Sequence, residues 1–188
     1  MISKTMGLFG VEAHQYYRWA GNPEEVRVTF TSDGVVVLIG ASLLAEAQEM
    51  DVATAYRLGL GAAAAKLGVL PIIERSVEDV KRLFDAVTAE SYSDHSPSYP
   101  ETELGTLGKS VRKAMGWMER RGLSGPSEKL SKAGGVDVVG PWMEGIRRTC
   151  LRAALVLSGD LVQCGLQAGG VGEDMRETWP KMPAEKKR

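Results

Sequence analysis

The spacing of apolar residues predicts a β-hairpin near the start of the chain. Val26, Val28 and Phe30 alternate with polar residues, and a TSDG stretch separates them from the continuous apolar run VVVLI at 35–39. The Asp-Gly pair of that stretch can supply the positive φ angle of a tight turn. We therefore predict two paired strands, the second of which is buried on both faces.

Later segments show the signs of helices. Asp51 and Ser76 are suitable N-cap residues, and an aspartate three positions after Ser76 resembles a capping box. In the longer segments apolar residues recur every three to four positions, and Pro71 stops one of them. The pattern predicts helices over 42–47, 52–68, 76–90, 106–121 and 141–164.

One hairpin followed by helices is typical of an α+β, mostly helical fold, here an N-terminal β-hairpin followed by a helical bundle. We expect a loop at 91–100 and a linker or broken short helix at 122–135, where glycine, serine and proline gather. We predict a single domain over 1–169. Residues 170–188 contain two prolines and end in EKKR, and we predict a disordered C-terminal tail.

The composition is that of a globular protein, with 44% hydrophobic residues, 25% charged residues and a formal net charge of −1. This balance gives no global field that favours nucleic acid or an anionic membrane. The longest apolar run is interrupted by Lys66 and Pro71, and it is shorter than the roughly 20 residues of a membrane span. Cys150 and Cys164 are too few for a disulfide framework. We expect a cytoplasmic protein without membrane association.

Residues that could act in catalysis or bind a metal ion are few, and they are scattered along the sequence. Neither His14 nor His95 has a second His or Cys at ligand spacing, so we predict no metal ion and no cofactor. No nucleophile elbow or phosphate loop occurs, and we predict no catalytic residue. Five basic residues and Trp117 lie within 109–121. They are compatible with a nucleic-acid surface, but we favour a solvated helix face because the chain is not basic overall.

The helix predicted at 52–68 has an unusually small face, because AYRLGLGAAAAKLGV carries two glycines and four consecutive alanines. Before it come a strand that ends in Gly40, a Leu-Leu pair and an acidic turn. This order is similar to the front half of zincin-type metallopeptidases of the heat-shock and CaaX-processing branch, in which the helix carries H-E-x-x-H. The resemblance places Leu60 and Ala64 at the two metal histidines and Gly61 at the catalytic glutamate.

The stretch RRTCLRAALVLSGDL extends this resemblance and places Arg147 at the third metal ligand. It also resembles degenerate peptidase-like domains that accompany tetratricopeptide repeats in large bacterial proteins, through Arg152-Ala153 and Gly159-Asp160. None of the four residues at the motif positions suits zinc or proton transfer. The resemblance thus implies a pseudoenzyme, a non-catalytic peptidase-like domain that binds a protein partner or acts as a scaffold.

Three questions stay open in the sequence. The small helix face is explained either by a vacated active site with a cleft above it or by close approach of neighbouring elements. A vacant cleft would suit a small-molecule-binding regulatory domain, with Arg147 or Arg148 as an anion anchor. An enzyme of another class would need a polar cluster assembled by folding, around His14, Asp94 or His95. The sequence does not identify the partner or the oligomeric state.

Overall fold

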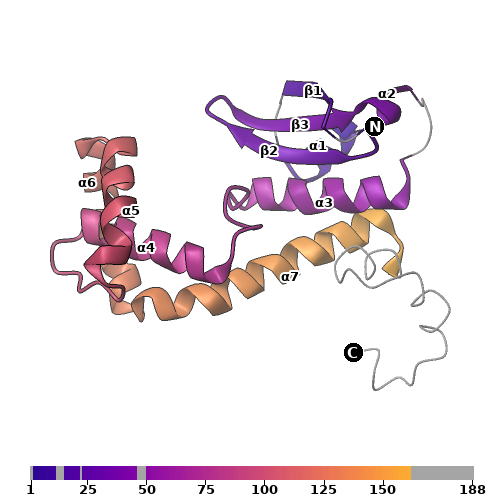
Figure 1. Ribbon diagram of the computed structural model, residues 1–188. Coiled ribbons are helices and arrows are strands. Elements are labelled where there is room, and N and C mark those ends of the chain that lie inside the picture. Colours follow the sequence, from indigo (N-terminus) through magenta and orange to yellow (C-terminus); the bar gives the residue numbers. More distant parts are fainter. Residues whose placement is uncertain (1, 12–14, 22, 46–49, 162–188) are drawn as a thin grey trace, which may run out of the picture. The chain divides into compact units, whose positions relative to one another are not determined.

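The structure is a computed structural model that describes residues 2–11, 15–21, 23–45 and 50–161 (Figure 1). The chain divides into two compact units. The first is built from the residues up to Ile73 and from Ile146 onward, and the second is Glu74–Gly145. The predicted domain boundary at residue 169 and the predicted tail at 170–188 lie outside the described residues.

The first unit contains a small sheet with the strand order β1-β3-β2. The predicted hairpin is confirmed, because β2 and β3 pair antiparallel with Val28 opposite Val37. A third strand was not predicted: β1 pairs parallel to β3, with Tyr17 opposite Leu38. The described elements of this unit are α1 (Ile2–Leu8), β1 (Gln15–Trp19), β2 (Val26–Thr31), β3 (Gly34–Gly40), α2 (Ala41–Ala45), α3 (Val52–Lys66) and the later part of α7 (Val139–Ser158).

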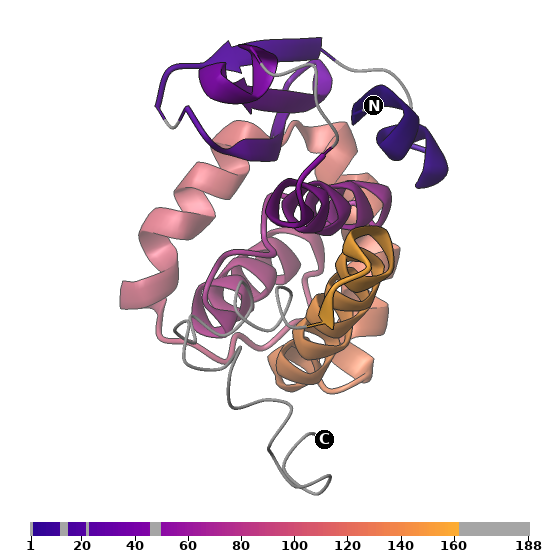
Figure 2. The ribbon, with the colours of Figure 1, turned by 90° about the vertical axis from the view of Figure 1, so that its right-hand side faces the viewer.

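Helix α3 runs along one face of the sheet, as the views in Figure 1 and Figure 2 agree. The core between them contains Val26, Val28 and Val37 of the sheet with Leu58 and Ala62 of α3. These five side chains are at most 7% exposed. The hydrophobic side of the hairpin is therefore fixed by the helix that covers it.

The ends of α3 follow from local chemistry. The Asp51 carboxylate accepts a hydrogen bond from the backbone N–H of Thr54 at 2.6 Å, which confirms the predicted N-cap. The helix ends at Lys66, before the predicted stop at Pro71, because Gly68 adopts a φ of +69° and turns the chain out of the helix.

The second unit consists of α4 (Val77–Ser91), α5 (Glu101–Ala114), α6 (Trp117–Lys132), a short 3-10 helix η1 (Gly135–Val138) and the first part of α7. The predicted helix over 76–90 corresponds to α4, and the hydroxyl of Ser76 accepts from the N–H of Asp79 at 3.0 Å. Its apolar face packs on α5 through Ala86, Leu104 and Val111.

Two predictions for this unit were wrong. Residues 106–121 do not form one helix, and 122–135 are not a linker: α5 ends at Ala114 and α6 continues to Lys132. A second helix begins after Gly116, the N-cap of α6, because the Glu119 carboxylate accepts a hydrogen bond from the backbone N–H of Gly116. Pro126 lies inside α6 on an exposed position, so the carbonyl group that loses its donor can be hydrated.

The last helix also differs from its prediction over 141–164. Helix α7 begins two residues earlier, at Val139, and ends at Ser158. Gly159 has a φ of +68°, and its N–H bonds to the carbonyl of Leu155. This left-handed residue ends the regular helix, as glycine often does.

Candidate functional site

The small face of α3 is in close contact with two neighbours. A Cβ atom added at Gly61 would lie 2.5 Å from the Cβ of Val28 in β2. A Cβ atom added at Gly59 would lie 2.9 Å from the Cα of Ala154 in α7. Both distances are shorter than a carbon–carbon contact allows. The glycines therefore let the sheet and α7 approach α3 closely, and the space beside Gly61 is filled by Val28.

The other positions named by the zincin-like resemblance are also part of the packing. Ala64 is fully buried in an apolar cluster with Cys150, and Leu60 is half-buried against the same cluster. Arg147 Nε donates to the carbonyl oxygen of Ile73 at 3.3 Å. Of the two interpretations of the small face, the contacts at Gly59 and Gly61 favour close approach of neighbouring elements. The hydrogen-bond partner of Arg147 that was just described is a backbone carbonyl oxygen, that of Ile73.

A buried polar cluster lies in the second unit, where α4 meets the loop that follows it. The side chains of Asp85 and His95 are 0% and 4% exposed, and Asp85 Oδ1 lies 2.7 Å from His95 Nε2. Asp85 Oδ2 accepts from the backbone N–H groups of Ser98 and Tyr99 at 2.8 and 3.0 Å. Both carboxylate oxygens thus have hydrogen-bond partners, and three residues of the loop, His95, Ser98 and Tyr99, are held on α4.

The same cluster contains a serine, but the geometry of the cluster suits a structural role. His95 Nδ1 lies 3.4 Å from Ser131 Oγ. Activation of a nucleophile requires a base within about 2.6–3.2 Å and access for the substrate, whereas the His95 ring is buried. We therefore assign the Asp85–His95 pair to holding the loop at 92–100 on α4.

Sequence reasoning found this cluster only in part. It named His95 together with His14 and Asp94. His14 lies outside the described residues, and Asp94 is exposed and accepts a hydrogen bond from Ser93. Asp85 and Ser131 were missed, because neither stands in a recognisable motif and only the fold brings them to His95.

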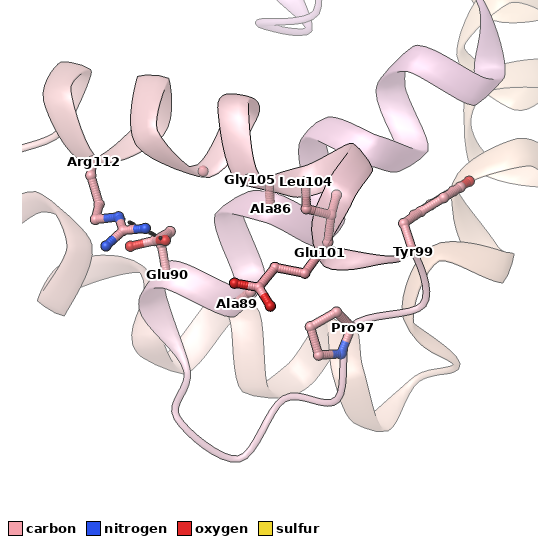
Figure 3. Close-up of a pocket in the computed structure, with 10 residues that line it drawn as sticks. Ala86, Ala89, Glu90, Pro97, Tyr99, Glu101, Leu104, Gly105 and Arg112 are labelled. Atoms are coloured by element: carbon pink, nitrogen blue, oxygen red, sulfur yellow. Dashed lines mark ion pairs between the residues drawn. The ribbon is translucent and has the colours of Figure 1, made fainter.

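The second unit also contains a pocket of about 270 Å³ between α4, α5 and the loop that joins them (Figure 3). We call it the α4–α5 pocket. Its lining is mostly small and apolar, and its polar groups are two carboxylates and one guanidinium. The lining residues are Ala86, Ala89, Glu90, Pro97, Tyr99, Glu101, Leu104, Gly105, Gly108 and Arg112.

The charges of the α4–α5 pocket differ in how far they are neutralised. Glu90 is paired with Arg112, whose Nε lies 3.0 Å from its carboxylate, and with Arg120 at 4.0 Å. Glu101 extends from the first turn of α5, and its carboxylate is turned towards the space between Ala89 and Pro97 (Figure 3). Among the residues that the structure describes, it has no hydrogen bond or ion pair.

Tyr99 lines the pocket through its ring. Burial, followed by a hydrogen bond with Glu78, raises the pKa of Tyr99 to about 12. The guanidinium carbon of Arg82 lies 5.6 Å from the centre of the ring and opposes this effect. The hydroxyl group is turned away from Glu101 (Figure 3). Tyr99 therefore contributes an aromatic wall to the pocket, and its phenol does not act as an acid there.

A third feature is an exposed aromatic surface at the start of α6. Trp117 is 64% exposed and Met118 is 80% exposed, and the Arg121 guanidinium lies 5.2 Å from the Trp117 ring centre. We call these three residues the Trp117 surface. The basic face considered at 109–121 is divided between α5 and α6, and two of its arginines pair with Glu90.

Within the described ranges, no three His, Cys, Asp or Glu side chains are grouped so that they could share a metal ion. No helix in the described part of the chain has the length and hydrophobicity needed to cross a membrane. Comparisons of the chain with protein-family models, curated proteins and solved structures find no match.

Proposed function

We propose that this chain is a non-catalytic interaction module that binds another protein through the Trp117 surface. The observation that carries the proposal is the exposure of Trp117 and Met118 side by side at the start of a helix. Tryptophan, methionine and arginine are enriched in protein interfaces, and tryptophan and arginine are frequent among the residues that dominate binding energy. The guanidinium group of Arg121 lies over the exposed ring of Trp117 as a cation–π partner.

Burial of the Trp117 side chain would contribute a substantial part of the binding energy. Covering the 64% of Trp117 that is exposed would remove on the order of 160 Å² from water. At about 25 cal/mol per Å², this corresponds to at most about 4 kcal/mol. One such anchor, surrounded by contacts that exclude water, is typical of the centre of an interface.

The first unit would then serve as a scaffold. Under the proposed zincin-like register, positions 60, 61 and 64 carry leucine, glycine and alanine. None of these can ligate zinc or accept a proton. The contacts of Gly61 with Val28 and of Ala64 with Cys150 are consistent with a helix used for packing. Stoichiometric zinc or metal-dependent peptide cleavage would contradict this part of the proposal.

Affinity capture with the 188-residue chain as bait, at moderate salt, tests the proposal. The wild type is compared with the double variant Trp117→Ala/Met118→Ala and with Leu8→Ala, which removes an equally exposed apolar side chain (72%) from the first unit. We expect one dominant protein that wild type and Leu8→Ala retain and the double variant loses. A partner retained equally by all three baits refutes the assignment of the surface.

A small-molecule-binding regulatory role is the second candidate function. The observation that favours it is the α4–α5 pocket, because the space beside Gly61 is filled. The two roles are compatible within the second unit, since the lining of the pocket and the Trp117 surface share no residue.

A further inference from the structure

One face of α5 borders open space in the part of the chain that the structure describes. Glu101, Gly105, Gly108 and Arg112 follow one another at helical spacing and all line the α4–α5 pocket. Gly108 is explained by its neighbour, because a Cβ atom there would lie 3.3 Å from a carboxylate oxygen of Glu90. Gly105 has no such reason, because nothing lies within 4 Å of its added Cβ position.

A glycine inside a helix is unfavourable relative to alanine, and at Gly105 no close contact within the described chain offsets this cost. The space that its missing side chain leaves lies one turn after Glu101, on the same side of α5. The helix dipole accounts for an acidic residue in the first turn. It does not account for the hollow beside that residue.

The charges of the α4–α5 pocket indicate the class of the occupant. Glu90 already has Arg112 and Arg120 as counter-ions. Glu101 has no counter-ion among the described residues and is turned to the pocket (Figure 3). The group that complements this pocket is a single cation with an apolar portion, since Ala89, Leu104 and Pro97 form apolar walls.

We propose that the α4–α5 pocket binds a small organic cation, an ammonium or guanidinium group on a short aliphatic chain, with Glu101 as its counter-ion. The volume of about 270 Å³ is below the 300–1,000 Å³ that is usual for drug-sized ligands. A chain of a few carbon atoms fits this size. The cation comes either from a free alkylamine or from a lysine or arginine side chain of a polypeptide. This inference does not depend on the proposed protein-binding surface.

The test is an NMR titration of the ¹⁵N-labelled 188-residue chain with n-butylammonium chloride. Sodium butyrate and sodium chloride serve as controls for the alkyl chain and for ionic strength. We expect saturable shifts of the amide signals of α4 and α5 residues that line the pocket with the ammonium compound alone. The affinity should fall as salt is added, because Glu101 is exposed and its charge is screened.

Two variants make the test specific. Glu101→Gln keeps the shape and removes the charge, and it should weaken binding by about tenfold or more. Gly105→Leu fills the hollow, and it should abolish binding while the melting temperature stays constant or rises. Its matched control is Gly122→Leu, at another helical glycine with open space around it, which should bind like wild type.

The outcomes separate clearly. Equal shifts with butyrate or sodium chloride, no saturation, or unchanged affinity in Glu101→Gln would overturn the proposal. Tighter binding of a lysine-containing tripeptide than of butylammonium identifies a polypeptide source, and weaker binding identifies a free amine. The variant Trp117→Ala/Met118→Ala should retain butylammonium binding, so failure of the pocket and failure of the protein-binding surface are distinguished.

Discussion

Substitution of Gly61 by alanine distinguishes the two explanations of the small α3 face by the sign of its effect. An alanine in a helix is more favourable than a glycine by up to about 1 kcal/mol. If a vacant cleft lay beside residue 61, Gly61→Ala would therefore stabilise the protein. In the structure, the new Cβ atom would lie 2.5 Å from Val28 Cβ and 2.6 Å from Val28 Cγ2.

The magnitude follows from these distances. Inserting a methyl group into a packed core costs about 1–3 kcal/mol, because neighbours must shift or adopt strained rotamers. The nearest atom is a Cβ, which cannot move away without its backbone, so the cost should lie in the upper half of that range. After subtraction of the gain in helix propensity, we expect a net loss of about 1–2 kcal/mol in the free energy of unfolding.

Urea unfolding followed by circular dichroism measures this difference. Gly122→Ala is the matched control, because Gly122 lies within α6 with nothing near its Cβ position, and it should gain up to about 1 kcal/mol. Combining Gly61→Ala with Val28→Ala removes the Cγ2 contact and should reduce the cost of the alanine. A gain in stability for Gly61→Ala equal to that for Gly122→Ala would refute the close-packing explanation.

Three further predictions concern two buried side chains, Asp85 and Cys150, and the half-buried Tyr99. Asp85→Ala leaves His95 and two backbone N–H groups without their acceptor, so it should lower the free energy of unfolding by about 3–5 kcal/mol in urea unfolding, with exposed Asp94→Ala near zero. Burial raises the pKa of the Cys150 thiol, so in a Cys164→Ser background a thiol-reactive disulfide should modify it only upon unfolding. The folded state holds the Tyr99 proton more tightly than the unfolded state, so this group stabilises the fold below pH 10 and loses its contribution as the pH rises towards about 12. Stability measured across that pH range should fall less steeply for Tyr99→Phe than for wild type.

Much of the fold was predictable because its elements carry local signals. The alternating apolar residues around the Asp-Gly turn predicted β2 and β3, and the N-caps Asp51 and Ser76 fixed the starts of α3 and α4. Strand β1 was missed because four of its five residues are exposed, so QYYRW has no apolar face to mark a strand. The boundary between α5 and α6 was missed because periodicity alone does not show a break at Gly116.

The candidate site was less predictable, because its members come from different elements. His95 was named in the sequence, but its partner Asp85 lies ten residues earlier and is recognised only by its burial. The α4–α5 pocket depends on the packing of two helices and a loop. Trp117 was named in the sequence with the basic residues of 109–121, and in the structure its side chain is exposed.

The helical glycines differ in what surrounds them. A helical glycine is a small local loss, and its explanation is sought in a close neighbour. For Gly59 and Gly61 the neighbours are α7 and β2, so packing within the first unit accounts for both glycines. For several other helical glycines, among them Gly105, Gly122 and Gly125, the described chain provides no close neighbour. Of these, Gly105 lines the α4–α5 pocket together with Glu101. Under the proposed cation site, an occupant of the α4–α5 pocket would offset the loss at Gly105.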